Sequence, residues 1–255
     1  MKSYFLYLLI TSFLFLSCKK DDTSDLPKTL QSFIEEQSNL TSFNELVACA
    51  AGGQEDFLDD DNFPLSVFFY PELNAADFKY YETENSDDDP NNLNLFLEKT
   101  ASQEPLFNGF LRRFILPKPE QDVWARVSFT ANDTLWYCKA VRLKYFEKPT
   151  QYAPELCQVD LSNSMEPIFS WQDGTADDNF IYFQVISDEN NNALSGTYTN
   201  DSFFQYYNLD NVVFNVTRPG QVKPLQIGST YHFTLMGVSN DNWVNLIVDK
   251  NFEVQ

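Results

Sequence analysis

The chain has 255 residues, of which 43% are hydrophobic, 16% are aromatic and 21% are charged. This composition is typical of a chain that folds around hydrophobic cores, and it excludes a disordered, collagen-like or low-complexity protein. The formal net charge of −20 argues against nucleic acid, which binds basic surfaces, and against a basic patch on anionic lipid. The length favours roughly two domains.

The first 17 residues have the pattern of a secretory signal peptide. Lys2 is followed by an apolar run over residues 4–16, and the small residue Ser17 closes it. This run is shorter than the roughly 20 residues that a transmembrane helix needs. We therefore expect residues 1–17 to direct export and to be removed.

Residues 14–18, with the sequence LFLSC, resemble the processing site of bacterial lipoproteins, although Phe15 and Leu16 depart from the usual residues. The resemblance implies lipid attachment at Cys18, and residues 18–29 would then form a lipidated tether. A lysine and two acidic residues follow, as in the export signal of Bacteroidetes surface lipoproteins: Lys20, Asp21 and Asp22. This second resemblance implies a position on the outer face of the outer membrane, anchored by more than one acyl chain.

The first half of the remaining chain has residue patterns typical of β-strands. Residues 28–46 fit either a short helix after Pro27 or an irregular lead-in. Segments rich in Phe, Tyr, Val and Trp then alternate with turn clusters. We predict strands over residues 46–51, 65–70, 77–83, 93–99, 107–116, 123–130 and 134–146. About seven short strands at this spacing predict a β-sandwich over residues 30–148.

Residues 149–154 contain two prolines and form the predicted linker. Residues 155–255 have the length of one immunoglobulin-like sandwich. We predict strands over residues 157–161, 167–171, 180–187, 194–198, 203–207, 212–216, 230–238 and 243–248. The expected fold class is all-β, with two tandem immunoglobulin-like β-sandwich domains after a cleaved lipoprotein signal peptide.

Three stretches of the second half resemble a fibronectin type III domain: residues 169–171, 181–185 and 225–235. The resemblance implies that Trp171 lies in the core. It also implies that Tyr231 is a tyrosine corner, whose hydroxyl bonds to the backbone upstream. Residues 203–223 are longer than the family usually has, and Ile227 replaces its usual proline.

Three cysteines remain after Cys18. Export permits disulfides, and an odd number leaves at least one thiol unpaired within the chain. Cys49 and Cys138 both fall in the first predicted domain, where they could form a disulfide or lie buried as thiols. Cys157 falls in the second domain.

Acidic turns are the candidate Ca²⁺ sites, because Ca²⁺ takes six to eight oxygen ligands. The candidates of the second domain are Asp173, Asp177 and Asp178. These turns lack the alternating EF-hand pattern, and Asp is common in turns for local reasons, so solvated loops are the other interpretation. We expect no other cofactor.

The sequence has no Gly-x-Ser-x-Gly elbow, P-loop or His-Glu-x-x-His motif. The only histidine, His232, lies between Tyr231 and Phe233 in a predicted strand, so it should face away from the core. We expect no enzymatic activity. Aromatic runs at residues 136–137 and 203–207 place rings on both faces of a strand, where exposed rings would suit a sugar or a protein.

The predicted function is a non-catalytic cell-surface lipoprotein that acts as a binding or adhesion module for glycan or protein. The alternative is a structural or accessory subunit of an outer-membrane complex, with the second domain as a spacer. No nucleic-acid partner is expected. The sequence does not identify the ligand.

Overall fold

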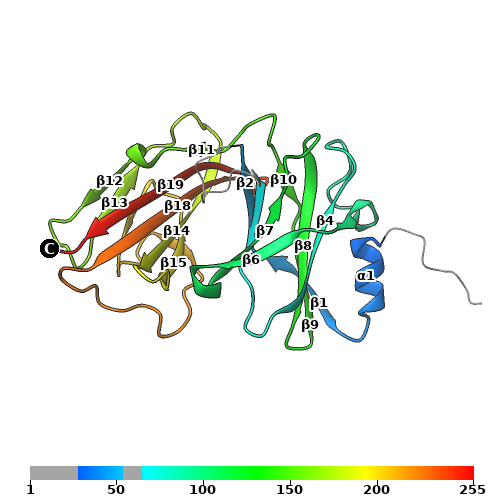
Figure 1. The fold of residues 1–255 in the computed structure, drawn as a ribbon, viewed down its shortest axis with the longest axis horizontal. Coiled ribbons are helices and arrows are strands. Elements are labelled where there is room, and N and C mark those ends of the chain that lie inside the picture. Colours follow the sequence, from blue (N-terminus) through cyan, green and yellow to red (C-terminus); the bar gives the residue numbers. More distant parts are fainter. Residues whose placement is uncertain (1–27, 54–64) are drawn as a thin grey trace, which may run out of the picture.

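A computed structural model describes residues 28–53 and 65–255. The protein is an all-β sandwich protein with one short helix, α1 (Leu30–Glu36). Figure 1 shows two sandwiches side by side along the long axis of the molecule. The predicted signal peptide, Cys18 and the export signal lie outside the described residues.

The first sandwich consists of two sheets. One has the order β1-β9-β8-β4-β5, with β10 also paired to β8, and the other has the order β2-β3-β7-β6. Their bounds are β1 (Thr41–Leu46), β2 (Ala48–Gly52), β3 (Leu65–Phe69), β4 (Ala76–Glu82), β5 (Leu97–Lys99), β6 (Ser102–Leu106), β7 (Leu111–Leu116), β8 (Val123–Ala131), β9 (Thr134–Cys138) and β10 (Val141–Leu143). Apolar side chains from both sheets, including Phe69, Phe114 and Phe129, form the core between them.

The helix α1 covers the outer face of the first of these sheets. Its Thr29 cap is reciprocal, since Thr29 Oγ1 accepts from the Ser32 amide at 3.1 Å and Ser32 Oγ accepts from the Thr29 amide at 3.0 Å. Leu30 and Phe33 then pack on Tyr81 and neighbouring side chains of the sheet. Residues 41–46 continue as strand β1, not as helix, and pair in parallel with β9.

The second sandwich also consists of two sheets, with the orders β11-β19-β18-β14-β15-β17 and β12-β13-β16. Their bounds are β11 (Gln151–Tyr152), β12 (Cys157–Asp160), β13 (Ile168–Trp171), β14 (Asn179–Asp188), β15 (Ala193–Thr199), β16 (Phe203–Gln205), β17 (Val212–Asn215), β18 (Thr230–Ser239) and β19 (Val244–Glu253). Trp171 lies in the core between these sheets, where its ring packs edge-on against Tyr182. The Tyr231 hydroxyl accepts from the Gln226 amide at 3.0 Å, as the tyrosine-corner resemblance implies.

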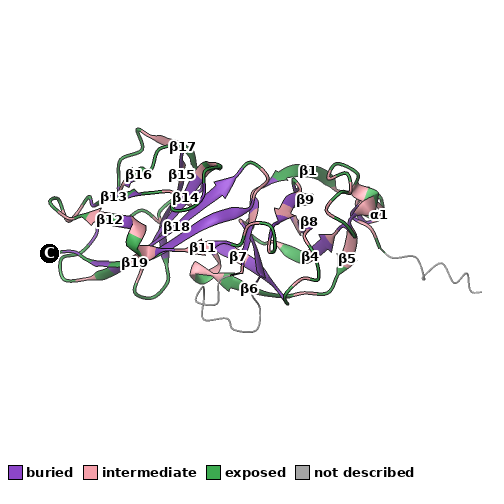
Figure 2. Ribbon diagram, turned by 90° about the horizontal axis from the view of Figure 1, so that it is seen from above, coloured by how far each residue is buried: buried purple, intermediate pink, exposed green. Residues whose placement is uncertain are grey.

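The two sandwiches pack against each other through the outer faces of two sheets. Successive residues of a strand point to opposite faces, and on β18 Phe233 and Leu235 enter the second core while Met236 and Val238 face the first sandwich. Phe68 and Leu111 of the first sandwich contact this outer face. Figure 2 shows the result, since β18 is buried along most of its length while β6 is not. The molecule is therefore a stack of four sheets with three apolar layers between them.

The segment predicted as a linker is an ordered part of this junction. Within it, β11 pairs in parallel with β19, and Thr150 Oγ1 accepts from the Gly52 amide at 3.0 Å and donates to the Val244 carbonyl at 2.8 Å. The Thr150 side chain is buried. This segment fixes the two sandwiches to each other.

Candidate functional site

The hairpin between β18 and β19 reaches from the second sandwich into the first. Its Trp243 is 0% exposed and belongs to the core of the first sandwich. The indole Nε1 donates to the Lys148 carbonyl at 2.7 Å. On the same hairpin, the Ala50 amide donates to the Asn242 carbonyl at 3.0 Å and the Arg142 amide donates to the Asp241 carbonyl at 2.8 Å. The hairpin tip thus bonds to β2 and β10, one strand from each sheet of the first sandwich.

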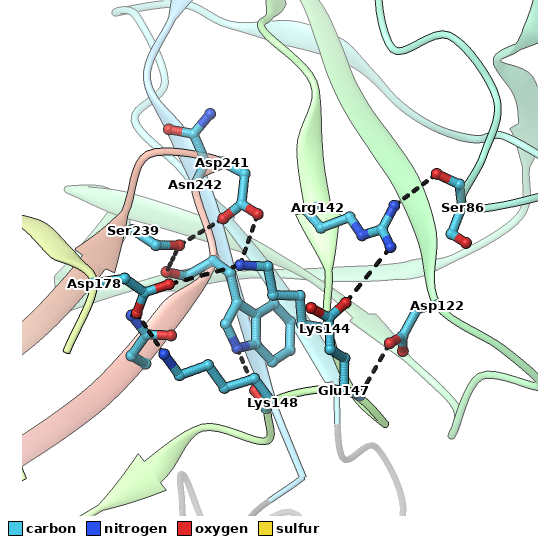
Figure 3. A network of polar contacts seen from close by, with 12 residues as sticks. Ser86, Asp122, Arg142, Lys144, Glu147, Lys148, Asp178, Ser239, Asp241 and Asn242 are labelled. Atoms are coloured by element: carbon cyan, nitrogen blue, oxygen red, sulfur yellow. Dashed lines mark hydrogen bonds and ion pairs between the residues drawn. The ribbon is translucent and has the colours of Figure 1, made fainter. Parts of the chain in front are cut away.

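Ion pairs surround this hairpin tip, as Figure 3 shows. Lys144 is largely buried, and its ammonium lies 2.7 Å from Asp241 and 4.0 Å from Asp178. Lys148 lies 2.5 Å from Asp178, which also accepts from Asn245 Nδ2 at 2.7 Å. Lysines of the first sandwich therefore pair with carboxylates of the second.

The three predicted Ca²⁺ ligands of the second sandwich all have protein partners. Asp178 and Asp177 pair with Lys148, and Asp173 accepts from Asn179 Nδ2 at 3.0 Å and from the Tyr182 hydroxyl. Burial acts to raise the pKa of Asp178, but the hydrogen bond and charge of Lys148, with Lys144, hold that pKa below its usual value. Among the described residues there is no group of three or more His, Cys, Asp or Glu side chains that could hold a metal ion.

Cys49 and Cys138 do not form the disulfide that was one of the two sequence interpretations. Both are free thiols, as is Cys157. The physical reason is the alternation of β2, since Ala48 and Ala50 face the first core with Cys138 while Cys49 faces the junction between the sandwiches. Cys138 is a buried thiol and Cys49 is a half-buried one.

A second set of contacts joins the sandwiches on the side of Arg218. The Arg218 guanidinium donates to the Tyr70 hydroxyl at 3.3 Å and to the Pro71 carbonyl at 3.2 Å. It also lies over the Tyr70 ring, 5.4 Å from its centroid. Nearby, Gly196 permits close approach, because a Cβ at that position would overlap the Phe110 ring. Side chains of both sandwiches therefore interdigitate at each end of the junction.

One flank of the second sandwich exposes apolar side chains. We define the apolar flank as the exposed residues of β13, β16, β17 and the loop between the last two: Ile168, Phe203, Tyr207, Leu209, Val213 and Phe214. Phe203 is 45% and Phe214 is 48% exposed. The strands β16 and β17 are edge strands of their sheets, and Figure 2 shows them on the same side of the molecule. Exposed apolar side chains on neighbouring edge strands are candidates for an interaction surface.

Sequence reasoning found part of this flank. In residues 203–207 the rings do alternate, because Phe204 and Tyr206 are buried in the core while Phe203 and Tyr207 are exposed. The run at residues 136–137 is taken up by packing, with Trp136 on the first core and Tyr137 beside α1. The other members of the flank were missed, since an isolated Ile168 or Leu209 carries no signal of exposure in the sequence.

The flank belongs to a part of the chain in which the acidic residues have no basic counterparts. Residues 151–217 contain ten Asp and Glu residues and no Lys or Arg. The acidic residues next to the flank, Asp201 and Asp210, are exposed. A partner surface with an apolar centre and a basic rim would complement both properties.

A scan against models of protein families finds no match, and no curated protein matches the sequence. Among solved structures, the FN1–FN3 domains of chicken CNTN1 align with 84% of this chain and 68% of their own chain, at 13% identity and a TM-score of 0.28. Among the described residues, no helix is long and apolar enough to cross a membrane.

Proposed function

We propose that the protein is a non-catalytic binding module for another protein, and that the apolar flank is its binding surface. The observation that carries the proposal is the set of exposed apolar side chains on two edge strands. They lie in a stretch of the chain whose Asp and Glu residues have no Lys or Arg among them. Exposed Phe, Leu and Val side chains suit the apolar core of a protein interface. The acidic rim would speed the encounter with a basic partner.

We further propose that the module is displayed from a lipid anchor at Cys18 on the outer face of the outer membrane. The LFLSC sequence and the following Lys20, Asp21 and Asp22 support this proposal. Radiolabelled palmitate should enter the wild-type chain and not a Cys18→Ala variant. An unchanged amount of Cys18→Ala protein on washed cells would contradict it.

Site-specific photo-crosslinking on intact cells tests the binding surface. A photoreactive residue at Tyr207 should yield one discrete crosslinked protein. The same residue at Phe146, which is exposed on the first sandwich, serves as the matched control and should not yield it. Identical crosslinks from both positions, or none from Tyr207, would overturn the proposal.

The affinity of flank variants for the crosslinked partner then shows whether the flank contacts that partner or only lies near it. A double variant, Phe203→Ser with Phe214→Ser, should weaken binding at least tenfold. The matched double variant, Leu73→Ser with Phe146→Ser, removes apolar side chains of the first sandwich that are 64% and 50% exposed, and it should bind normally. Binding should weaken as salt rises, because rim charges are screened.

The locked junction favours a second candidate, a structural or accessory subunit of an outer-membrane complex. Ion pairs and the inserted Trp243 hold the two sandwiches in a fixed relation, which suits a rigid spacer. In that case the chain should co-purify with a membrane complex, and substitutions in the flank should leave this association intact.

A further inference from the structure

The sequence contains one Asn-Gly pair, Asn108 with Gly109, in the loop between β6 and β7. In such a pair the glycine amide nitrogen can attack the side-chain carbonyl carbon of the asparagine, because glycine has no Cβ to hinder the approach. Asn108 is exposed, and a Cβ at Gly109 would have no neighbour within 4 Å, so water reaches the pair. This loop is therefore a candidate site of spontaneous deamidation.

The second sandwich holds the side chain of Asn108. Its Nδ2 donates to the Asn190 carbonyl at 2.9 Å and to Asn192 Oδ1 at 2.8 Å, and both acceptors lie in the turn between β14 and β15. Asp188 fixes this turn, because its Oδ1 accepts from the main-chain amides of Asn190 and Asn192 at 2.9 Å each. The amide group of Asn108 is thus part of the junction between the sandwiches.

The folded backbone keeps this pair from reacting. Asn108 has φ 50° and ψ 40°, in the left-handed region that asparagine adopts more often than most residues. At this ψ the Gly109 nitrogen lies on the opposite side of the Cα–C bond from Asn108 Cβ, so it cannot reach Cγ. Ring closure requires a rotation about this bond, and the side chain must also leave its two acceptors. The reaction therefore has to wait until this end of the junction opens.

We propose that Asn108 is a deamidation site whose reaction is controlled by opening of the junction. When the loop opens, the Gly109 nitrogen bonds to Asn108 Cγ, the Cγ–Nδ2 bond breaks, and the Nδ2 group leaves as ammonia with the Gly109 amide proton. Water then opens the cyclic imide at one of its two carbonyls. Attack at Cγ gives an aspartate, and attack at the main-chain carbonyl gives an isoaspartate, in which the chain continues through the former side chain.

Either product prevents the loop from returning to its contacts. A carboxylate only accepts hydrogen bonds, and here it would face two acceptors, the Asn190 carbonyl and Asn192 Oδ1. Asn192 cannot turn its amide round without loss, because its Nδ2 donates to both Asp188 oxygens, at 3.1 Å and 2.9 Å. The Gly109 carbonyl of the same loop accepts from Arg218 at 3.4 Å. Deamidation would therefore loosen this end of the junction permanently, and it goes beyond the proposed function because it does not involve the apolar flank.

Peptide mapping by mass spectrometry follows deamidation of the full-length chain in detergent at neutral pH. In native buffer the product at Asn108 should form at least about tenfold more slowly than in urea, because the reaction requires local opening. Asn192→Ala removes one acceptor of Asn108 and should speed the native reaction at least about threefold, with no change in urea. Asn163→Ala, exposed in the loop between β12 and β13, is the matched control and should react at the wild-type rate.

A mimic of the product tests the consequence for the junction. Asn108→Asp should speed amide hydrogen exchange of residues 188–196 at least about fivefold, and Asn163→Asp should leave it at the wild-type rate. Strand β8, in the first core, is the internal reference, because exchange there rises only if the variant unfolds globally. The proposal is overturned if wild-type Asn108 reacts as fast in native buffer as in urea, if Asn192→Ala leaves the native rate unchanged, or if Asn108→Asp leaves the exchange of residues 188–196 unchanged.

Discussion

The three thiols among the described residues should react slowly, because burial raises their pKa values. Burial raises the pKa of Cys49 to about 12 and the pKa values of Cys138 and Cys157 to about 11. The thiolate is the reactive form, and a pKa in this range leaves almost none of it at pH 8. Cys138 Sγ, moreover, accepts from the Val127 amide at 3.0 Å. Oxidation of these thiols to disulfides is therefore disfavoured by both geometry and chemistry.

We expect residues 25–255, which lack Cys18, to show no rapidly reacting thiol with Ellman's reagent at pH 8 in the native state. In denaturant all three cysteines should react. A disulfide would leave one reactive thiol after denaturation, and mass spectrometry of the alkylated protein would locate it. This result would contradict the free thiols of the structure.

Trp243 joins the two sandwiches, because it lies between β18 and β19 of the second and packs in the core of the first. Trp243→Ala should lower the free energy of unfolding by about 3–5 kcal/mol, because it leaves a cavity in the first core. Trp243→Phe keeps most of the packing and loses the bond to the Lys148 carbonyl, so about 1–2 kcal/mol is expected. Urea titration measures both changes. A loss below about 0.5 kcal/mol for Trp243→Ala would show that the indole is not part of the core.

At the level of elements, sequence patterns located most strands and missed those with weak signals. Residues 93–97 alternate in polarity and predict a strand, but Asn92 caps a 3-10 turn at Leu93–Leu95, and only β5 follows. Strand β6 was missed because it is short, polar and contains Pro105, which edge strands tolerate. Within the predicted linker, β11 pairs with a strand about 95 positions away, and no local pattern predicts such a pairing.

Asp178, in the loop before β14, should make the free energy of unfolding depend on pH. The pKa of Asp178 is lower in the folded chain than its ordinary value of 3.8. A carboxyl with a depressed folded pKa stabilises the fold above its unfolded pKa, and this contribution is lost as pH falls through the folded value. Asp178→Asn should therefore reduce stability at pH 6–7, by at most about 1 kcal/mol since the carboxylate is partly exposed.

This difference between Asp178→Asn and the wild type should begin to shrink below about pH 4 and should disappear once the pH lies below the folded pKa of Asp178. Urea titrations at a series of pH values measure it. Asp177→Asn is the control, since the Asp177 side chain is 97% exposed and lies 3.7 Å from the same lysine. An Asp178→Asn deficit that persists at pH 2.5 would mean that the carboxylate charge is not its cause.

At the scale of the whole molecule, the four sheets form one mechanical unit. We expect a single unfolding transition by circular dichroism and by tryptophan fluorescence, because the apolar layer between the sandwiches couples them. Residues 151–255 expressed alone would expose Phe183, Val185 and Met236 to water, and we expect this fragment to aggregate. Two resolved transitions, or a soluble monomeric fragment, would show that the junction is dispensable.

The packing of the four sheets could not be predicted from residue patterns, although two strands have the pattern of burial on both faces. Strand β2 reads ACAAG and β18 reads TYHFTLMGVS, and neither has the clean alternation of a sheet with one solvated face. Two-sided burial explains both, but it does not say which other sheet covers the second face. The flank depends on that same long-range arrangement, so only isolated members such as Phe203 could be singled out beforehand.

The position of Trp243 has a consequence for the order of folding during synthesis. This residue completes the core of the first sandwich, yet about 95 residues separate it from Lys148, the last residue of that half to which it bonds. A ribosome adds residues at about 5–20 per second, so the first half waits at least about 5 s, unfinished, for its final core residue. Its incomplete apolar face would be available to chaperones throughout that interval. A hairpin of the second sandwich therefore completes the first sandwich, which is translated before it.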